Sequence, residues 1–131
     1  MAVWIDKHLE EYVRNFFPDR YVSAYHKSGT WQTSRYIQVS TCLKDEKHIH
    51  YEYYQEHIEL HLEDKFQSED YRQFAKELRQ QTSRNPKLSW HSWQGRSQCR
   101  CRLDAPVHDE GAVVNSLKEI VAIFDELIKN A

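Results

Sequence analysis

The chain has 131 residues, of which 40% are hydrophobic and 29% are charged, and it contains only three Gly and three Pro. This size and composition favour a single globular domain over residues 1–131 and exclude a disordered, collagen-like or linker-rich chain. The formal net charge is -2, a balance that by itself indicates neither a nucleic acid nor a membrane surface as partner.

The sequence carries no signal for a membrane or for secretion. No apolar run approaches the ~20 residues that a membrane-spanning helix requires, and residues 1–13 lack the basic and then apolar layout of a signal peptide. The three cysteines, Cys42, Cys99 and Cys101, are an odd number and cannot all pair within one chain. We therefore expect a cytoplasmic protein with reduced thiols and no membrane partner.

The N-terminal third predicts a helix followed by a hairpin. Apolar residues recur at helical spacing over residues 3–17, and Pro18 ends this helix because it disfavours helical geometry in the residue before it. Residues 20–25 and 31–43 are rich in β-forming residues and predict two strands joined by a short turn.

The segment 48–64, HIHYEYYQEHIELHLED, predicts a second hairpin with two chemically different faces. We place its turn at Gln55-Glu56, which fixes the register of the two arms. Counting outward gives the pairs Tyr53 with Ile58, Glu52 with Glu59, Tyr51 with Leu60, and His50 with His61. The apolar side chains are assigned to the core, and the other face is polar.

The remaining sequence predicts a helix over 68–82, a third hairpin over 87–103 and a long, mostly buried helix over 109–129. The element order is then α-β-β-β-β-α-β-β-α. This order is typical of an α+β fold, with a mainly antiparallel sheet and helices packed on one of its faces. The other face is expected to meet water or a partner.

The third hairpin also predicts two faces. If Trp93 pairs with Arg96, then Trp90 pairs with Cys99 and Leu88 pairs with Cys101. The cysteines then share the core face with Trp90. Their C-x-C spacing is too short for a zinc knuckle, so we interpret the thiols as small buried hydrophobes.

The charges of the chain are unevenly distributed. Residues 44–70 hold nine acidic residues against three Lys, whereas residues 71–102 hold eight Lys or Arg against the single Glu77. Two interpretations stay open: the segments present acidic and basic surfaces to different partners, or they neutralise each other as neighbours in one sheet.

The sequence contains no complete catalytic set, so we expect a non-enzymatic module without a cofactor that binds another macromolecule, in the first place a protein. Trp and Arg are the residue types enriched at binding hot spots. The expected binding residues are Trp93, Arg96, Arg100, Arg102, His91, Glu52 and Glu59. Residues 91–102 also suit base stacking and phosphate contact on a sheet, so a nucleic-acid-binding domain is an alternative.

A metal-dependent hydrolase or nuclease is a further alternative. His50, His61, Glu52 and Glu59 form a square on the outer face of the second hairpin, and two imidazoles with two carboxylates suit a transition metal. The competing interpretation is that these side chains stand on an open sheet face and only form hydrogen bonds with one another or with arginines. Residues 63–65, Glu-Asp-Lys, also match half of a restriction-endonuclease-type metal site, although no Pro precedes the acidic residues 45 and 46.

The motif IHYEYYQEHIELHLE is followed by a short amphipathic helix, then by LSWHSWQGRSQCRCRL and a long C-terminal helix. Over residues 48–128 the chain resembles an uncharacterised bacterial α+β domain that occurs alone or at the ends of restriction and defence proteins. The resemblance implies an α+β fold and a bacterial setting but assigns no activity. A role in bacterial defence, toxin neutralisation or regulation would suit the expected binding module. The order of elements is also similar to that of type III secretion chaperones, which are small dimers, so a homodimer stays open.

Overall fold

A computed structural model of the chain describes residues 3–26, 35–41, 49–54, 56–63, 69–93 and 96–130; the side chains of residues 26, 35, 93 and 96–98 lie outside this description. The elements are α1 (Lys7–Asn15), β1 (Val22–His26), β2 (Arg35–Ser40), β3 (Ile49–Tyr54), β4 (His57–Leu62), α2 (Glu69–Gln81), β5 (Leu88–Trp93), β6 (Arg96–Leu103) and α3 (Glu110–Asn130). They confirm the α+β class and the predicted order of elements.

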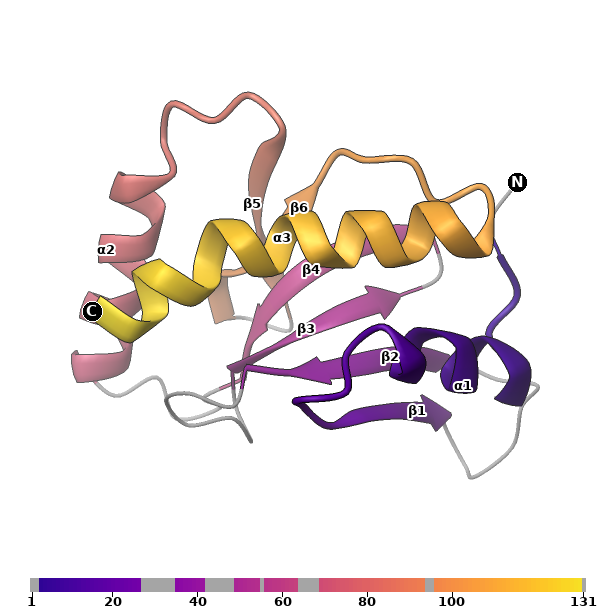
Figure 1. Cartoon of the computed structure of the whole chain (residues 1–131). Coiled ribbons are helices and arrows are strands. Elements are labelled where there is room, and N and C mark those ends of the chain that lie inside the picture. Colours follow the sequence, from indigo (N-terminus) through magenta and orange to yellow (C-terminus); the bar gives the residue numbers. More distant parts are fainter. Residues whose placement is uncertain are drawn as a thin grey trace.

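The strands form one six-stranded sheet in the order β1-β2-β3-β4-β6-β5, and every neighbouring pair is antiparallel. The helices pack on one face, as predicted. Figure 1 shows α3 crossing the sheet over β3 and β4, with α1 covering β1 and α2 packing against α3. The strands β3 and β4 are therefore central in the sheet and lie beneath the longest helix.

The core lies between the sheet and the helices. Strict alternation sends every second strand residue toward the helices, so the side chains assigned to the core in the second hairpin are at most 2% exposed. These are Ile49, Tyr51, Tyr53, Ile58, Leu60 and Leu62. The stripe of α3 that covers them includes Val113, Leu117, Ile120 and Phe124, each fully buried.

Helix α1 begins at Lys7 rather than at residue 3, because Asp6 adopts an extended backbone and caps the helix. The Asp6 carboxylate accepts a hydrogen bond from the Leu9 backbone N–H at 2.9 Å, which satisfies one of the free donors of the first turn. The helical periodicity in the sequence extends upstream of this cap, so periodicity alone placed the start too early.

The register predicted for the third hairpin is wrong beyond its tip. Trp93 pairs with Arg96 as predicted, but Trp90 pairs with Cys101 and Leu88 pairs with Leu103, because the register shifts between His91 and Trp93. The shift is even, so Leu88 and Trp90 stay on the core face with the cysteines. Both Cys99 and Cys101 are free thiols and buried, as predicted.

A buried polar contact joins the central strand to the long helix. Tyr51 Oη on β3 donates to Asp125 Oδ1 on α3 at 2.5 Å. Arg20 Nη2 donates to the other oxygen of Asp125 at 2.9 Å, and its Nη1 donates to the Ser40 carbonyl at 3.2 Å. This network fixes α3 against β3 on the face opposite to the polar one.

Among the described residues, no helix is long and apolar enough to cross a membrane.

Candidate metal centre

The face of the sheet opposite the helices carries a set of buried polar side chains. His50 and Glu52 project from β3, and Glu59 and His61 project from β4, with exposed fractions of 1%, 3%, 1% and 8%. The expectation that these side chains stand on an open face is therefore wrong, whereas the expected hydrogen bonds among them and with an arginine are present. Both strands are interior to the sheet, with β2 beside β3 and β6 beside β4.

The pairing predicted for this hairpin is confirmed. His50 lies opposite His61, and Glu52 lies opposite Glu59. The two imidazole rings meet edge to face, with their centroids 5.5 Å apart and their planes inclined at 80°. The register alone therefore brings two histidines and a carboxylate into contact.

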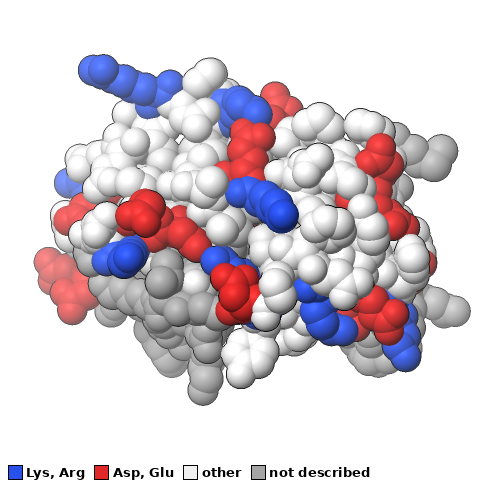
Figure 2. All heavy atoms as spheres, in the orientation of Figure 1, with Lys and Arg blue, Asp and Glu red and all other residues white. Residues whose placement is uncertain are grey.

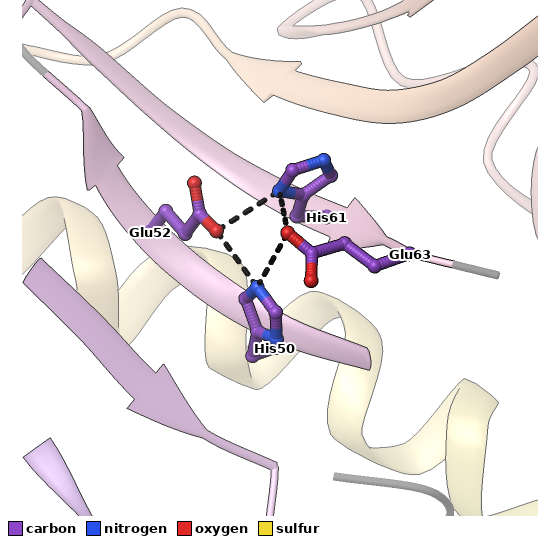
Figure 3. Close-up of side chains that lie close together, drawn as sticks. All are labelled: His50, Glu52, His61 and Glu63. Atoms are coloured by element: carbon purple, nitrogen blue, oxygen red, sulfur yellow. Dashed lines mark hydrogen bonds and ion pairs between the residues drawn. The ribbon is translucent and has the colours of Figure 1, made fainter. Parts of the chain in front are cut away.

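Glu63 completes this group from the residue after the end of β4. Glu52 Oε2 lies 2.7 Å from His50 Nε2 and 2.9 Å from His61 Nδ1. Glu63 Oε1 lies 3.7 Å from the same nitrogen of His50 and 3.3 Å from the same nitrogen of His61. Figure 3 shows the four side chains pointing toward a common centre. We call His50, Glu52, His61 and Glu63 the His/Glu cluster.

The His/Glu cluster has the dimensions of a metal site. One ligand atom from each residue lies within 4.8 Å of every other. In a tetrahedral zinc site with bonds of about 2.0–2.1 Å, ligand atoms lie about 3.3 Å apart. The four nitrogen-to-oxygen separations, 2.7 to 3.7 Å, span that value. The two shortest separations are hydrogen bonds of Glu52, so a cation between these atoms would replace the hydrogen bonds to both histidines.

Glu59 is engaged elsewhere. Arg100 Nε lies 2.8 Å from Glu59 Oε2, and Arg100 Nη2 donates to Glu59 Oε1 at 3.2 Å. The group predicted from the hairpin is therefore correct in three of its four residues, and Glu63 takes the place of Glu59. The ion pair also joins the acidic and basic segments of the chain, as the neutralising interpretation predicts.

The electrostatics of the His/Glu cluster favour positive charge at its centre. Burial opposes charge on His50, but its hydrogen bonds with Glu52 and Glu63 prevail and raise its pKa to about 9. Burial likewise opposes charge on Glu52, but hydrogen bonds from His50 and His61 lower its pKa to about 2. The pKa of Glu63 is also lowered, since the hydrogen bond and charge of His50 outweigh its burial. Two carboxylates thus stay ionised beside each other and attract a proton or a metal ion.

The outer nitrogens of the two rings differ from those of most metal-binding histidines. His50 Nδ1 and His61 Nε2 are buried and have no hydrogen-bond partner among the described residues. Metal-ligating histidines usually donate this second N–H to a carboxylate or carbonyl. Among the described residues, only the carboxylates of the His/Glu cluster therefore hold the two rings in place by polar contacts.

The structure also brings the other described candidate residues together on this face: Arg100 lies opposite His61 and His91, and Arg102 lies opposite Glu59. Arg100 is 5% exposed, whereas Arg102 and His91 are half-buried. The side chains of Trp93 and Arg96 lie outside the described residues. The same holds for residues 45, 46, 64 and 65 of the nuclease motif and for Cys42.

The two described cysteines, Cys99 and Cys101, are buried and lie outside the His/Glu cluster. Burial raises the pKa of the Cys101 thiol to about 12, which disfavours the thiolate that binds metal. Glu63 was not predicted to join the histidines, although it lies two residues after His61 and alternation places it on the same face.

Comparisons with known proteins assign neither a family nor a function to this chain. Searches of protein-family models, of curated proteins and of solved structures found no match. The class of the site therefore rests on its own geometry, which is that of a mixed histidine and carboxylate centre in a polar sheet face.

Proposed function

We propose that this protein binds a divalent transition-metal ion through His50, Glu52, His61 and Glu63. The observation that carries the proposal is the convergence of one ligand atom from each residue within 4.8 Å on a largely buried face. Imidazole and carboxylate together suit zinc and related ions, and each of these ligand types is common in such sites.

Charge balance supports a divalent ion over a simple hydrogen-bonded network. Glu52 and Glu63 bring two negative charges to a region where Glu52 is 3% exposed. Burying carboxylates is costly unless positive charge compensates them. A divalent cation supplies two charges at the point where the oxygens and nitrogens converge, whereas protonation of one histidine supplies a single charge.

The types of ligand also restrict which metal ions are expected to bind. Two nitrogen ligands favour Zn²⁺, Fe²⁺, Co²⁺, Ni²⁺ or Cu²⁺ over Mg²⁺ and Ca²⁺, which prefer oxygen alone. Glu63 is the most exposed of the four, with a side chain 33% exposed, so the ion is approached from its side.

Isothermal titration of the chelator-treated protein with Zn²⁺ tests the proposal. The wild type is expected to bind about one ion, and Glu52→Gln should lower the affinity at least about 100-fold because it removes a charged ligand without changing the side-chain volume. His61→Gln should also weaken binding, because it removes another ligand. Its matched control is His108→Gln, since His108 is exposed and lies outside the His/Glu cluster. A wild type that binds no ion, or a Glu52→Gln variant that binds as tightly, contradicts the proposal.

Binding of a protein partner stays a prediction. Of its expected residues, Arg100, Glu52 and Glu59 are buried, and the side chains of Trp93 and Arg96 are not described. A bacterial defence role, a cytoplasmic location and a homodimer are likewise predictions that no observation tests.

A further inference from the structure

A group of basic side chains lies on the same outer face, beside the His/Glu cluster. Arg102 on β6 pairs with Glu59 on β4 and with Ser89 on β5. The helix-covered face is different: Lys and Arg side chains lie among Asp and Glu across it (Figure 2), and Lys87 Nζ, for example, is 2.6 Å from Glu119 Oε2. On the outer face, Arg100 and Arg102 lie next to a single carboxylate, Glu59, which forms its ion pair with Arg100.

Arg102 has no acidic partner among the described residues. Its side chain is half-buried, and its Nε atom is buried and makes no hydrogen bond. The carboxylate directly across the strands, Glu59, already uses both oxygens for Arg100. A guanidinium that is partly desolvated and keeps unused donors attracts an external anion.

Two histidines lie within the positive potential of this arginine. Burial, followed by the charges of Arg102 and Arg100, lowers the pKa of both His57 and His91. The exposed Glu56 acts in the opposite direction on His57 alone. A bound anion would offset the arginine charges, so both rings would then take up protons more readily and donate to the anion.

A row of tyrosines leads away from His57 on the same face. Tyr54 pairs with His57, Tyr36 pairs with Tyr54, and Tyr25 pairs with Tyr36 across β3, β2 and β1. The ring centroids are 5.2 Å apart for Tyr25 and Tyr36 and 6.0 Å apart for Tyr36 and Tyr54. Tyr25 is 44% exposed at the end of the row. Aromatic side chains next to an anion site suit the stacking of a nucleobase.

We propose that Arg102, His57 and His91 form a phosphate site that binds a nucleotide, with its base against the tyrosine row. The planar fork of Arg102 matches two phosphate oxygens, and the two imidazoles supply further donors on either side. The phosphate can belong to a mononucleotide or to a single-stranded nucleic acid, because both present the same group beside a base. This proposal does not depend on a metal in the His/Glu cluster.

The test is an NMR titration of chelator-treated protein, in which the ring Cε1–H signals of His57 and His91 are followed. Three probes are added separately: inorganic phosphate, adenosine 5′-monophosphate and a short single-stranded oligodeoxythymidylate. The expected result is a saturable shift of both signals with either nucleotide probe, at a concentration at least about tenfold lower than with inorganic phosphate. The tighter of the two nucleotide probes identifies the source of the phosphate.

Variants separate the site from general charge. Arg102→Gln should weaken the nucleotide at least about tenfold, and Arg102→Lys should weaken it less, since Lys keeps the charge but loses the fork. Arg84→Gln removes the same charge from an exposed turn and should have no effect. No shift with any probe, equal shifts in Arg102→Gln, or equal affinity for phosphate and nucleotide would each overturn the proposal. Because no metal is present, its failure leaves the metal-binding proposal intact.

Discussion

His50 and His61 are directly paired across β3 and β4, and one oxygen of Glu52 lies within hydrogen-bond distance of both rings. One oxygen of Glu63 also lies near the same two ring nitrogens, so two carboxylates concentrate negative charge between the rings and attract a proton or a metal ion there.

Zinc should stabilise the folded protein against heat. A ligand that binds only the folded state adds about 2.7 kcal/mol when its concentration is about 100 times the dissociation constant. Thermal unfolding with and without Zn²⁺ should therefore show a higher midpoint for the wild type and for the control His108→Gln. Glu52→Gln should lose most of this increase, and an unchanged increase in that variant argues against the assigned ligands.

Metal affinity should rise with pH. The pKa of His50 is raised to about 9 in the metal-free protein, so its proton must leave before the ring nitrogen binds the ion. Between about pH 6 and 8 the apparent affinity should rise about tenfold per pH unit for one displaced proton. Titrations in buffers of different ionisation enthalpy measure the proton release, and an affinity independent of pH is the contrary result.

The stability of the metal-free protein should depend on pH through Glu52 and His50. The pKa of Glu52 is depressed to about 2 from an ordinary 4.5, so its stabilising contribution is complete above about pH 4.5 and is lost as the pH falls. The pKa of His50 is raised to about 9 from 6.5, so its contribution is complete below about pH 6.5 and is lost as the pH rises. Urea unfolding across pH should show this dependence in the wild type, and Glu52→Gln should flatten it on both sides.

The Arg100–Glu59 ion pair should behave as a buried pair. Both residues are at most 5% exposed, so Arg100→Met leaves a buried carboxylate without its partner. Loss of one member of such a pair costs about 3–5 kcal/mol of unfolding free energy. The double variant with Glu59→Met should recover much of this loss in urea unfolding. Equal destabilisation of the single and double variants would show that the charge pairing is not the cause.

The Tyr51–Asp125 hydrogen bond should stabilise the contact between β3 and α3. Tyr51 is fully buried and its hydroxyl donates to a carboxylate, so Tyr51→Phe should cost about 1.5–3 kcal/mol, the range for hydrogen bonds to charged groups. Tyr21→Phe is the matched control, because Tyr21 is 75% exposed. A Tyr51→Phe variant as stable as this control contradicts the structural role of the bond.

Local rules predicted much of the fold. The register of β3 and β4 follows from alternation and a short turn, and it alone brings His50 opposite His61. These rules failed at two places where a helix cap or a strand irregularity interrupts the regular pattern. The Asp6 cap shortens α1, and the irregularity near His91 shifts the pairing of β5 with β6.

The composition of the site depended on contacts between distant segments. Whether Glu59 or Glu63 joins the histidines is decided by the pairing of β4 with β6, which places Arg100 where it binds Glu59. That pairing cannot be read from the hairpin sequence.

The most direct test of the central claim is the location of a bound ion. Crystals of the protein grown with Zn²⁺ and measured at the zinc absorption edge should show one strong anomalous peak about 2.0–2.2 Å from His50 Nε2, His61 Nδ1 and Glu52 Oε2. Absence of any peak between these atoms, with ions found only elsewhere on the surface, would contradict the assignment.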